Sequence, residues 1–224
     1  MSVAGPAGAE VSVTGLTLYG FADSVYVRAV RMALAERGLD YDLLPLDPFD
    51  PSQRHWNPHP MGRVPVLDHA GFRLFETAAI LTYLAGQPGP DLIPTDPKAQ
   101  ARMVQVQGIA DAYAYRPLVR QVYAAGVYGP ARGEAVDTAR VAQGLEAAVP
   151  VLDMLEQIAA EGMVLTDQTL TLADLHLAPM IAAFVRHPDG AAMLNDRPAL
   201  ARWWDAMQDR DSLRDTDPGL PARA

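Results

Sequence analysis

Two short segments of this chain carry residue types that suit the binding of a small peptide. The first is Val64-Pro65, an apolar pair within residues 64–67, a run typical of a short strand. Proline has no N–H to give to a sheet, so Pro65 fits either an ordinary edge strand or a cis bond that turns the backbone of Val64 outward. In the second arrangement, Val64 would offer its N–H and C=O to a peptide lying alongside as an added strand.

The second segment is Glu76-Thr77, at the predicted junction between a strand at residues 72–75 and a helix. The start of a helix presents unpaired N–H groups and the positive end of a dipole, which suits a carboxylate. Thr77 adds a hydroxyl, and Glu76 adds a countercharge for an amine. A peptide with a free amine and free carboxylates would fit, although both residues are also ordinary in a first helical turn.

Four short strands and several helices must position these groups. Residues 16–19, 41–46, 64–67 and 72–75 read as strands, and a helix is expected from Ser24 to about Arg37, where Gly38 ends it. Strand, helix and strand in this order predict a parallel pair with a right-handed crossover. Ser24 fits an N-cap, which is worth about 1 kcal/mol.

Beyond a segment rich in proline and glycine at residues 86–97, the pattern is helical almost throughout. We expect helices at residues 98–125, bent at Pro117, and at 133–160 and 198–207. Thr171 and Asp174 form a capping-box pattern with a structural role. Residues 1–15 are expected to be a flexible extension, and the polar tail from Asp211 to be frayed.

Composition limits the function classes. The chain has 224 residues, 27 acidic and 18 basic side chains and a net charge of −9, which argues against a nucleic-acid or anionic-membrane surface. It has no cysteine, hence no disulfide and no thiolate nucleophile. No apolar stretch is long enough to cross a bilayer and no secretory signal is evident, so a cytoplasmic protein is expected. His55, His59 and His69 lack metal-ligand spacing, and we expect them at the surface or in loops.

The segment H-P-M-G-R-V-P-V-L, followed by G-F-R-L-F-E-T-A-A-I-L-T-Y-L, resembles the glutathione-binding half of cytosolic glutathione transferases. The resemblance implies a cis Pro65, with the backbone of Val64 pairing with the cysteinyl part of glutathione. It also implies that Glu76 and Thr77 hold the γ-glutamyl end. The match spans residues 59–84 with its spacing kept.

The stretch L-Y-G-F-A-D-S-V-Y-V-R-A-V-R is similar to the first strand and helix of serine-type, bacterial-like members of this family. By this resemblance, Ser24 donates a hydrogen bond to the sulfur of glutathione and needs no His/Asp partner, because it is not the nucleophile. Val25 stands where the family often has proline. Tyr19 is the first rival for this role, since tyrosine-type classes use a phenol at the end of the first strand, and Tyr26 is the second.

Several residues are candidates for binding the glycyl carboxylate and the second substrate. Family members often hold the glycyl carboxylate with a basic or amide side chain from the loop before Val64, where the candidates are Gln53, Arg54 and His55, and Arg63 also lies close. On the first long helix, the family places contacts to the second substrate. Tyr113 and Arg116 are the candidates there, although tyrosines at helical spacing are often core or interface residues.

The resemblance implies a thioredoxin-like α/β domain at residues 16–86, a linker at 87–97 and an all-helical domain at 98–224. It implies a homodimeric enzyme that conjugates glutathione, its co-substrate, to a small electrophile, with no metal, nucleic acid or membrane partner. The alternatives are a non-catalytic binding protein of the same fold and a glutathione-dependent isomerase or dehalogenase.

Overall fold

The computed structural model describes residues 15–221, and the extension expected at residues 1–15 lies outside this range except for Gly15. The chain divides into two compact units, Met1–Pro90 and Asp91–Ala224. The first contains the sheet and the second is helical, which confirms the fold class predicted from the sequence. Each unit is described by itself.

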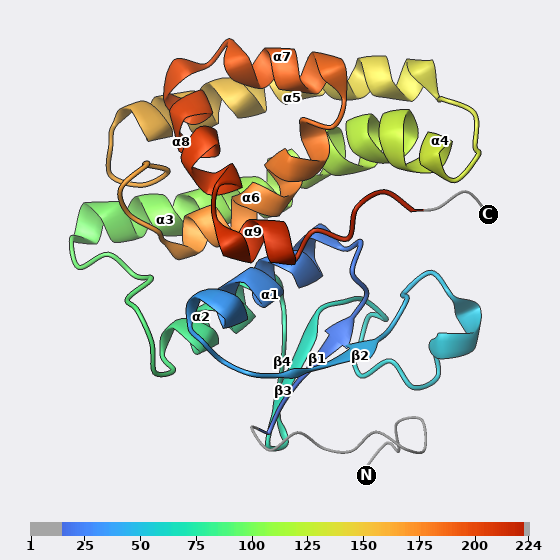
Figure 1. The fold of residues 1–224 in the computed structure, drawn as a ribbon, viewed down its shortest axis with the longest axis vertical. Helices are drawn as coiled ribbons and strands as arrows, with labels where there is room; N and C mark the ends of the chain where they lie inside the picture. Colours follow the sequence, from blue (N-terminus) through green and yellow to red (C-terminus); the bar gives the residue numbers. More distant parts are fainter. Residues whose placement is uncertain (1–14, 222–224) are drawn as a thin grey trace. The chain divides into compact units, whose positions relative to one another are not determined.

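The first unit is built on a four-stranded sheet in the order β2-β1-β3-β4 (Figure 1). β1 (Leu16–Gly20) leads through α1 (Val25–Glu36) to β2 (Asp42–Pro45), which pairs parallel to β1 and confirms the predicted parallel pair. β3 (Val66–His69) pairs antiparallel with β1 and with β4 (Phe72–Phe75). The hairpin loop is Ala70-Gly71, and both residues have positive φ, 51° and 90°, as a tight two-residue turn requires.

One face of this sheet is covered by α1 and α2 (Thr77–Ala85) (Figure 1). Alternation along β1 buries Leu16, Leu18 and Gly20 on this face. Gly20 permits the close approach of α1, because a Cβ at this position would lie 2.4 Å from a methyl carbon of Val27. The ring of Tyr83, on α2, covers the hairpin end of the same face, 5.3 Å from the ring of Phe72.

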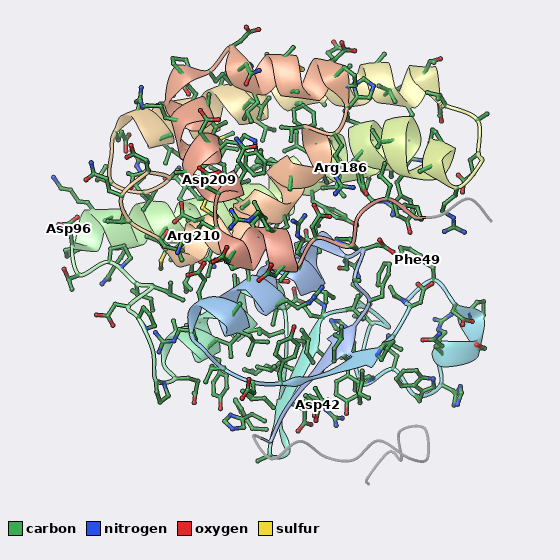
Figure 2. The ribbon with its side chains drawn as sticks, in the orientation of Figure 1. Asp42, Phe49, Asp96, Arg186, Asp209 and Arg210 are labelled. Atoms are coloured by element: carbon green, nitrogen blue, oxygen red, sulfur yellow. The ribbon has the colours of Figure 1, made fainter. Side chains whose placement is uncertain are left out.

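A continuous helix opens the second unit. α3 (Pro97–Ile109) is capped by Asp96, whose side chain accepts a hydrogen bond from the Ala99 N–H (Figure 2). It runs into η2 (Ala110–Tyr128), which has the wider winding of a π-helix, and ends in α4 (Gly129–Ala131). Pro117 lies inside η2, where its missing N–H would break a regular α-helical ladder.

The core of this unit is α6 (Leu172–Phe184), in which every residue is buried. It packs against α3, η2 and α8 (Pro198–Gln208), while α5 (Thr138–Ala160) lies against η2. The capping box predicted at Thr171 and Asp174 is confirmed at the start of α6. α7 (Pro188–Asn195) lies between α6 and α8 in the chain.

The expectation of a frayed tail from Asp211 was wrong. Residues Asp211–Asp215 form α9, in which Ser212 and Leu213 are buried. The segment after it is held by Arg186, which donates two hydrogen bonds to the Asp217 carboxylate, at 2.6 and 2.8 Å (Figure 2). Apolar burial of Leu213 and this ion pair therefore order a sequence that looks polar. Across residues 15–221, none of the helices combines the length and apolar character needed to span a bilayer.

Candidate functional site

Sheet register brings the three predicted segments to one edge of the first unit. Tyr19 in β1 pairs with Val66 in β3, and Val66 pairs in turn with Phe75 in β4. The loop that leaves β1, the residues that enter β3 and the residues that leave β4 therefore emerge at the same end of three adjacent strands. Neighbouring strands lie about 4.8 Å apart, so segments 21–24, 64–65 and 76–77 share a small region.

Ser24 is the N-cap of α1. Its Oγ accepts a hydrogen bond from the Val27 N–H at 3.3 Å, which satisfies one unpaired helical donor. The hydroxyl hydrogen has no acceptor in the described part of the chain, and the residue is partly exposed. The capping role and a donor role toward a ligand are therefore compatible, because one uses the oxygen lone pair and the other the proton.

The rival Tyr19 lies elsewhere. It alternates with Leu18 and Gly20 along β1, so it stands on the sheet face opposite α1. There the guanidinium carbon of Arg73 sits 6.0 Å from the centre of its ring. Tyr26 is the second residue of α1 and is partly buried. Ser24 is thus the candidate hydroxyl at the helix start itself.

The Val64-Pro65 peptide bond is cis, as the resemblance implied. β3 begins only at Val66, so the sheet leaves Val64 unpaired. Across residues 15–221, neither the N–H nor the C=O of Val64 makes a hydrogen bond. A partly exposed residue with both backbone groups open, just before the first residue of a strand, can accept an extended peptide through a pair of main-chain hydrogen bonds.

Glu76 and Thr77 stand at the start of α2. Glu76 is the N-cap residue, with a φ of 69°, and its side chain makes no capping bond. Its carboxylate is 74% exposed, while Thr77 is buried. A positive φ is strained for a residue with a Cβ, so the turn at Glu76 is an unusual one. It leaves the acidic side chain exposed beside the open N–H groups at the start of α2. This arrangement suits a ligand that carries both an amine and a carboxylate.

The sequence analysis missed His59. We expected a surface or loop histidine; His59 does lie in a loop, but its side chain is only 4% exposed. Its Nδ1 accepts the Met61 N–H at 3.0 Å, and its Nε2 lies 3.9 Å from Oε1 of Glu76. Burial lowers the pKa of His59; the charge of Glu76 raises it to a smaller extent, and Arg63 lowers it further. His59 precedes the V-P pair by only five residues, which was the available signal.

The loop before Val64 offers several groups for a ligand carboxylate. Gln53, in the short helix η1 (Pro51–Gln53), uses its amide within the loop: Oε1 accepts the Asp47 N–H and Nε2 donates to Asp50, each at 2.9 Å. Arg54 and His55 are exposed. Arg63 is also exposed and stands next to Val64, so it is the cation adjacent to the open backbone in sequence.

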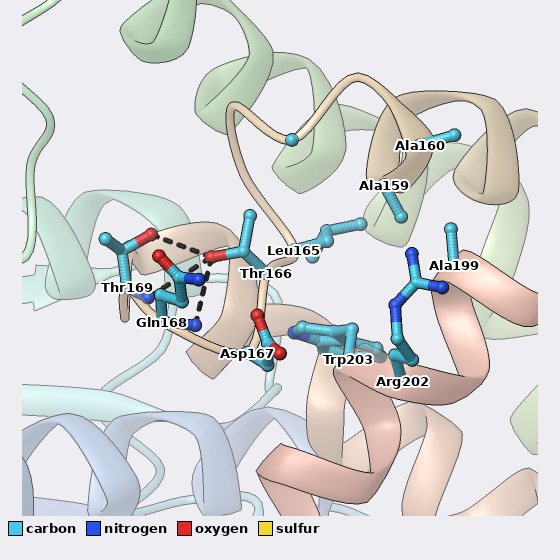
Figure 3. Close-up of a pocket in the computed structure, with 11 residues that line it drawn as sticks. Ala159, Ala160, Leu165, Thr166, Asp167, Gln168, Thr169, Ala199, Arg202 and Trp203 are labelled. Carbon is cyan, nitrogen blue, oxygen red and sulfur yellow. Dashed lines mark hydrogen bonds between the residues drawn. The ribbon is translucent and has the colours of Figure 1, made fainter.

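The predicted residues of the second unit are separate from this edge in the chain. Tyr113 and Arg116 lie on η2 and are exposed, Tyr113 by 58%. A cavity of about 280 Å³ lies in the same unit, next to the loop that follows α5 (Figure 3). Thr166, Asp167, Arg202 and Trp203 are among its lining residues, and none of the predicted site residues belongs to it. No group of three or more metal-ligating side chains occurs between residues 15 and 221.

Comparison with known proteins identifies the family. The model of the glutathione S-transferase N-terminal domain matches residues 18–91, and the model of the C-terminal domain matches residues 109–211. Glutathione S-transferase F13 of Arabidopsis thaliana is 30% identical, over 92% of this chain and 96% of that protein. The chain belongs to the glutathione S-transferase family.

Solved structures agree with this assignment. The structure of a glutathione S-transferase III in its apo form is 29% identical, with a TM-score of 0.77 over 92% of this chain and 98% of that one. A glutathione S-transferase-I bound with lactoylglutathione is 26% identical, with a TM-score of 0.74 over 91% of this chain and 98% of that one. The thioredoxin-like unit followed by a helical unit is thus the fold of this family.

Proposed function

We propose that this protein is a glutathione transferase in which Ser24 stabilises the thiolate of bound glutathione for attack on an electrophilic small molecule. The observation that carries the proposal is the shared edge of Ser24, Val64 and Glu76-Thr77, set by the β1-β3-β4 register. The relative whose structure holds lactoylglutathione, a glutathione thioester, supports glutathione as the ligand.

Each part of the tripeptide has a counterpart at this edge. The open N–H and C=O of Val64 pair with the cysteinyl backbone, next to the cis Pro65. Glu76 neutralises the γ-glutamyl ammonium, and the Thr77 hydroxyl with the α2 N–H groups binds the neighbouring carboxylate. Arg63 binds the glycyl carboxylate, and the second amide hydrogen of Gln53 is the alternative donor. Tyr113 and Arg116 contact the electrophile.

One hydroxyl at a helix start supplies enough free energy to stabilise the thiolate of glutathione. A free thiol has a pKa near 8.5, and lowering it by about two units requires about 2.7 kcal/mol of preference for the thiolate. A hydrogen bond to a charged acceptor supplies about 1.5–3 kcal/mol, and a helix N-terminus adds about 0.3–1 kcal/mol. The Ser24 hydroxyl supplies the hydrogen bond, and the start of α1 supplies the helix N-terminus. The thiolate then attacks the electrophilic carbon, and the leaving group departs with its bonding electrons.

Replacement of Ser24 tests this role. Ser24→Ala should lower kcat/KM for a chromogenic electrophile by about 10- to 100-fold and raise the pKa of the bound thiol, because the donor is lost. Glutathione affinity should stay nearly unchanged, since the tripeptide contacts remain. The matched control is Tyr19→Phe, which removes the rival phenol on the opposite sheet face and should retain turnover. Full turnover in Ser24→Ala would remove Ser24 from the mechanism.

We further infer that the protein acts as a homodimer in the cytoplasm. Met61 and Phe75 both contact His59, and the two residues are 76% and 40% exposed, which leaves an apolar surface beside the proposed glutathione site. We assign this surface to a second copy of the chain. Fractionation of source cells, with detection of the protein in the cytosolic fraction, tests the location.

A further inference from the structure

His59 stands at the start of the loop that delivers Arg63 and Val64 to the proposed glutathione site. Its ring is buried, and its backbone N–H donates to the Asn57 side chain at 2.9 Å. Because Nδ1 accepts the Met61 N–H, this nitrogen carries no proton. The neutral ring must therefore hold its single proton on Nε2, so the hydrogen-bond pattern of the loop fixes the tautomer.

The protonated nitrogen faces Glu76. Nε2 lies 3.9 Å from Oε1 of Glu76, and the ring packs against Phe75, the last residue of β4, at 4.9 Å between centres. A separation of 3.9 Å is too long for a hydrogen bond. The Glu76 side chain is largely exposed, so a small rotation can bring its carboxylate within hydrogen-bond distance of the Nε2–H group.

We propose that His59 is a positioning residue for glutathione: Nε2–H orients the Glu76 carboxylate toward the γ-glutamyl ammonium, while Nδ1 holds the loop that carries Arg63 and Val64. This inference rests on the proposed function. One buried ring would then position both the carboxylate that binds the γ-glutamyl end and the loop that binds the central part of the tripeptide. His59 does not touch the reacting sulfur, and it acts through Glu76 and the loop.

The arrangement makes glutathione binding sensitive to pH. A second proton on the ring has to enter at Nδ1, where it would meet the Met61 N–H and break the bond that holds the loop. The charged groups that face the ring are Glu76, from the start of α2, and Arg63, from its own loop; the ring of Phe75, from β4, is uncharged. An imidazolium would also compete with the ligand ammonium for Glu76. Affinity should therefore fall as the pH drops through the pKa of His59.

Two amide substitutions separate the two roles of the ring. An asparagine side chain can place an oxygen near the position of Nδ1, so His59→Asn keeps the acceptor for Met61 and loses the donor toward Glu76. A glutamine can place its NH₂ near the position of Nε2, so His59→Gln keeps the donor and loses the loop bond. Thermal unfolding of both variants checks that they fold.

The readout is the dissociation constant for glutathione and for its deaminated analogue, glutaryl-cysteinylglycine, measured by calorimetry. The wild type should prefer glutathione, and His59→Asn should reduce this preference about tenfold, because the oriented carboxylate is lost. His59→Gln should retain the preference but bind both peptides more weakly. The pKa of the bound thiol should be the same in all three proteins, since Ser24 is untouched.

An equal preference in the wild type and His59→Asn would overturn the inference while leaving the proposed function intact. Failure of the wild type to bind glutathione at all would instead overturn the proposed function. If neither variant folds, the wild type alone decides: its preference for glutathione over the deaminated peptide should decline as the pH is lowered below about 6.5, the ordinary pKa of a histidine, because burial holds the pKa of His59 below that value. A preference that does not change with pH would contradict the proposal.

Discussion

At the scale of single residues, Asp174 is a carboxylate that is completely buried. It accepts hydrogen bonds from the N–H and the hydroxyl of Thr171, both at 2.6 Å, and from Nε1 of Trp203 at 2.7 Å. Burial raises its pKa from 3.8 to about 6, and these three donors only partly oppose the effect. The side chain therefore closes the start of α6 and ties it to α8, with a charge in an apolar core.

The raised pKa fixes the sign of a pH effect. The folded state keeps a proton on Asp174 between about pH 4 and 6 that the unfolded state has lost, so this stabilisation is present at low pH and disappears as the pH rises through about 6. A shift of about two pKa units corresponds to about 3 kcal/mol. As the pH rises from about 4 to 7, urea unfolding should show that the free energy of unfolding of the wild type falls by up to this amount relative to that of Asp174→Asn, whose side chain cannot titrate.

Asp137→Asn is the matched control for this measurement. Asp137 also caps a helix, by accepting the Arg140 N–H at 3.0 Å, but it is exposed. Its replacement should cost about 1 kcal/mol or less, with little change between pH 4 and 7. A free-energy difference between the wild type and Asp174→Asn that stays constant over this range would contradict a buried, titrating carboxylate.

The same scale shows what the sequence could and could not reveal. Ser24, Glu76 and Thr77 were predicted where the structure has them, because each lies where a helix begins after a strand. Pro65 was predicted inside a strand at residues 64–67, but β3 begins one residue later, at Val66. His59 lies in a loop, as one of the two alternatives predicted, but its burial was not predicted because it depends on the loop returning over Phe75, 16 positions along the chain. No local pattern encodes that contact. The roles of all these residues in binding stay predictions.

At the scale of elements, the sequence predicts a helix cap only when the capping residue is next to the helix in the chain. Asp96 caps α3 from the adjoining position, and such caps are readable in the sequence. The start of α8 is closed instead by Glu156, on α5, whose carboxylate accepts the N–H groups of Ala199 and Leu200 at 3.0 and 2.8 Å. The apolar periodicity of the sequence predicted α8. Its capping group could not be predicted, because Glu156 lies more than 40 positions away in the chain. α9 depended in the same way on tertiary burial.

The contact between β1 and α1 yields a prediction at this scale. Gly20→Ala would place a Cβ 2.4 Å from Val27, well inside van der Waals contact, and α1 would have to move away from the sheet. We expect the free energy of unfolding to fall by about 1–3 kcal/mol, as for other overpacked cores. Because Ser24 begins α1, thiolate stabilisation should fall as well. Chemical unfolding and the pKa of the bound thiol measure the two effects.

Two further variants control this test. Gly108→Ala, in α3, meets nothing within 4 Å and should stabilise the helix by about 0.5–1 kcal/mol. In Gly20→Ala/Val27→Ala, the shortened side chain gives space to the new methyl group, so the loss of stability should be smaller than the sum of the two single losses. Additive losses would show that the clash at Val27 is not the cause.

At the scale of the whole molecule, charge and exposed apolar surface act against each other. Two copies with a net charge of −9 each repel, so a homodimer needs apolar contact to form. Met61 and Phe75, which both contact His59, provide this apolar contact in our proposal. Because salt screens the repulsion and leaves apolar burial largely intact, the dimer should become tighter as ionic strength rises.

Met61→Asp tests this arrangement, because it buries a charge and adds to the repulsion. Sedimentation velocity should show a particle of two chains for the wild type and of one chain for Met61→Asp at the same micromolar concentration. Leu220→Asp, which adds the same charge at another exposed apolar position, should remain dimeric. A monomeric wild type would refute the dimer, whereas a dimeric Met61→Asp would place the contact on another surface. Since Met61 also donates its N–H to His59, a monomeric variant that retains glutathione affinity would show that each copy completes its own tripeptide site.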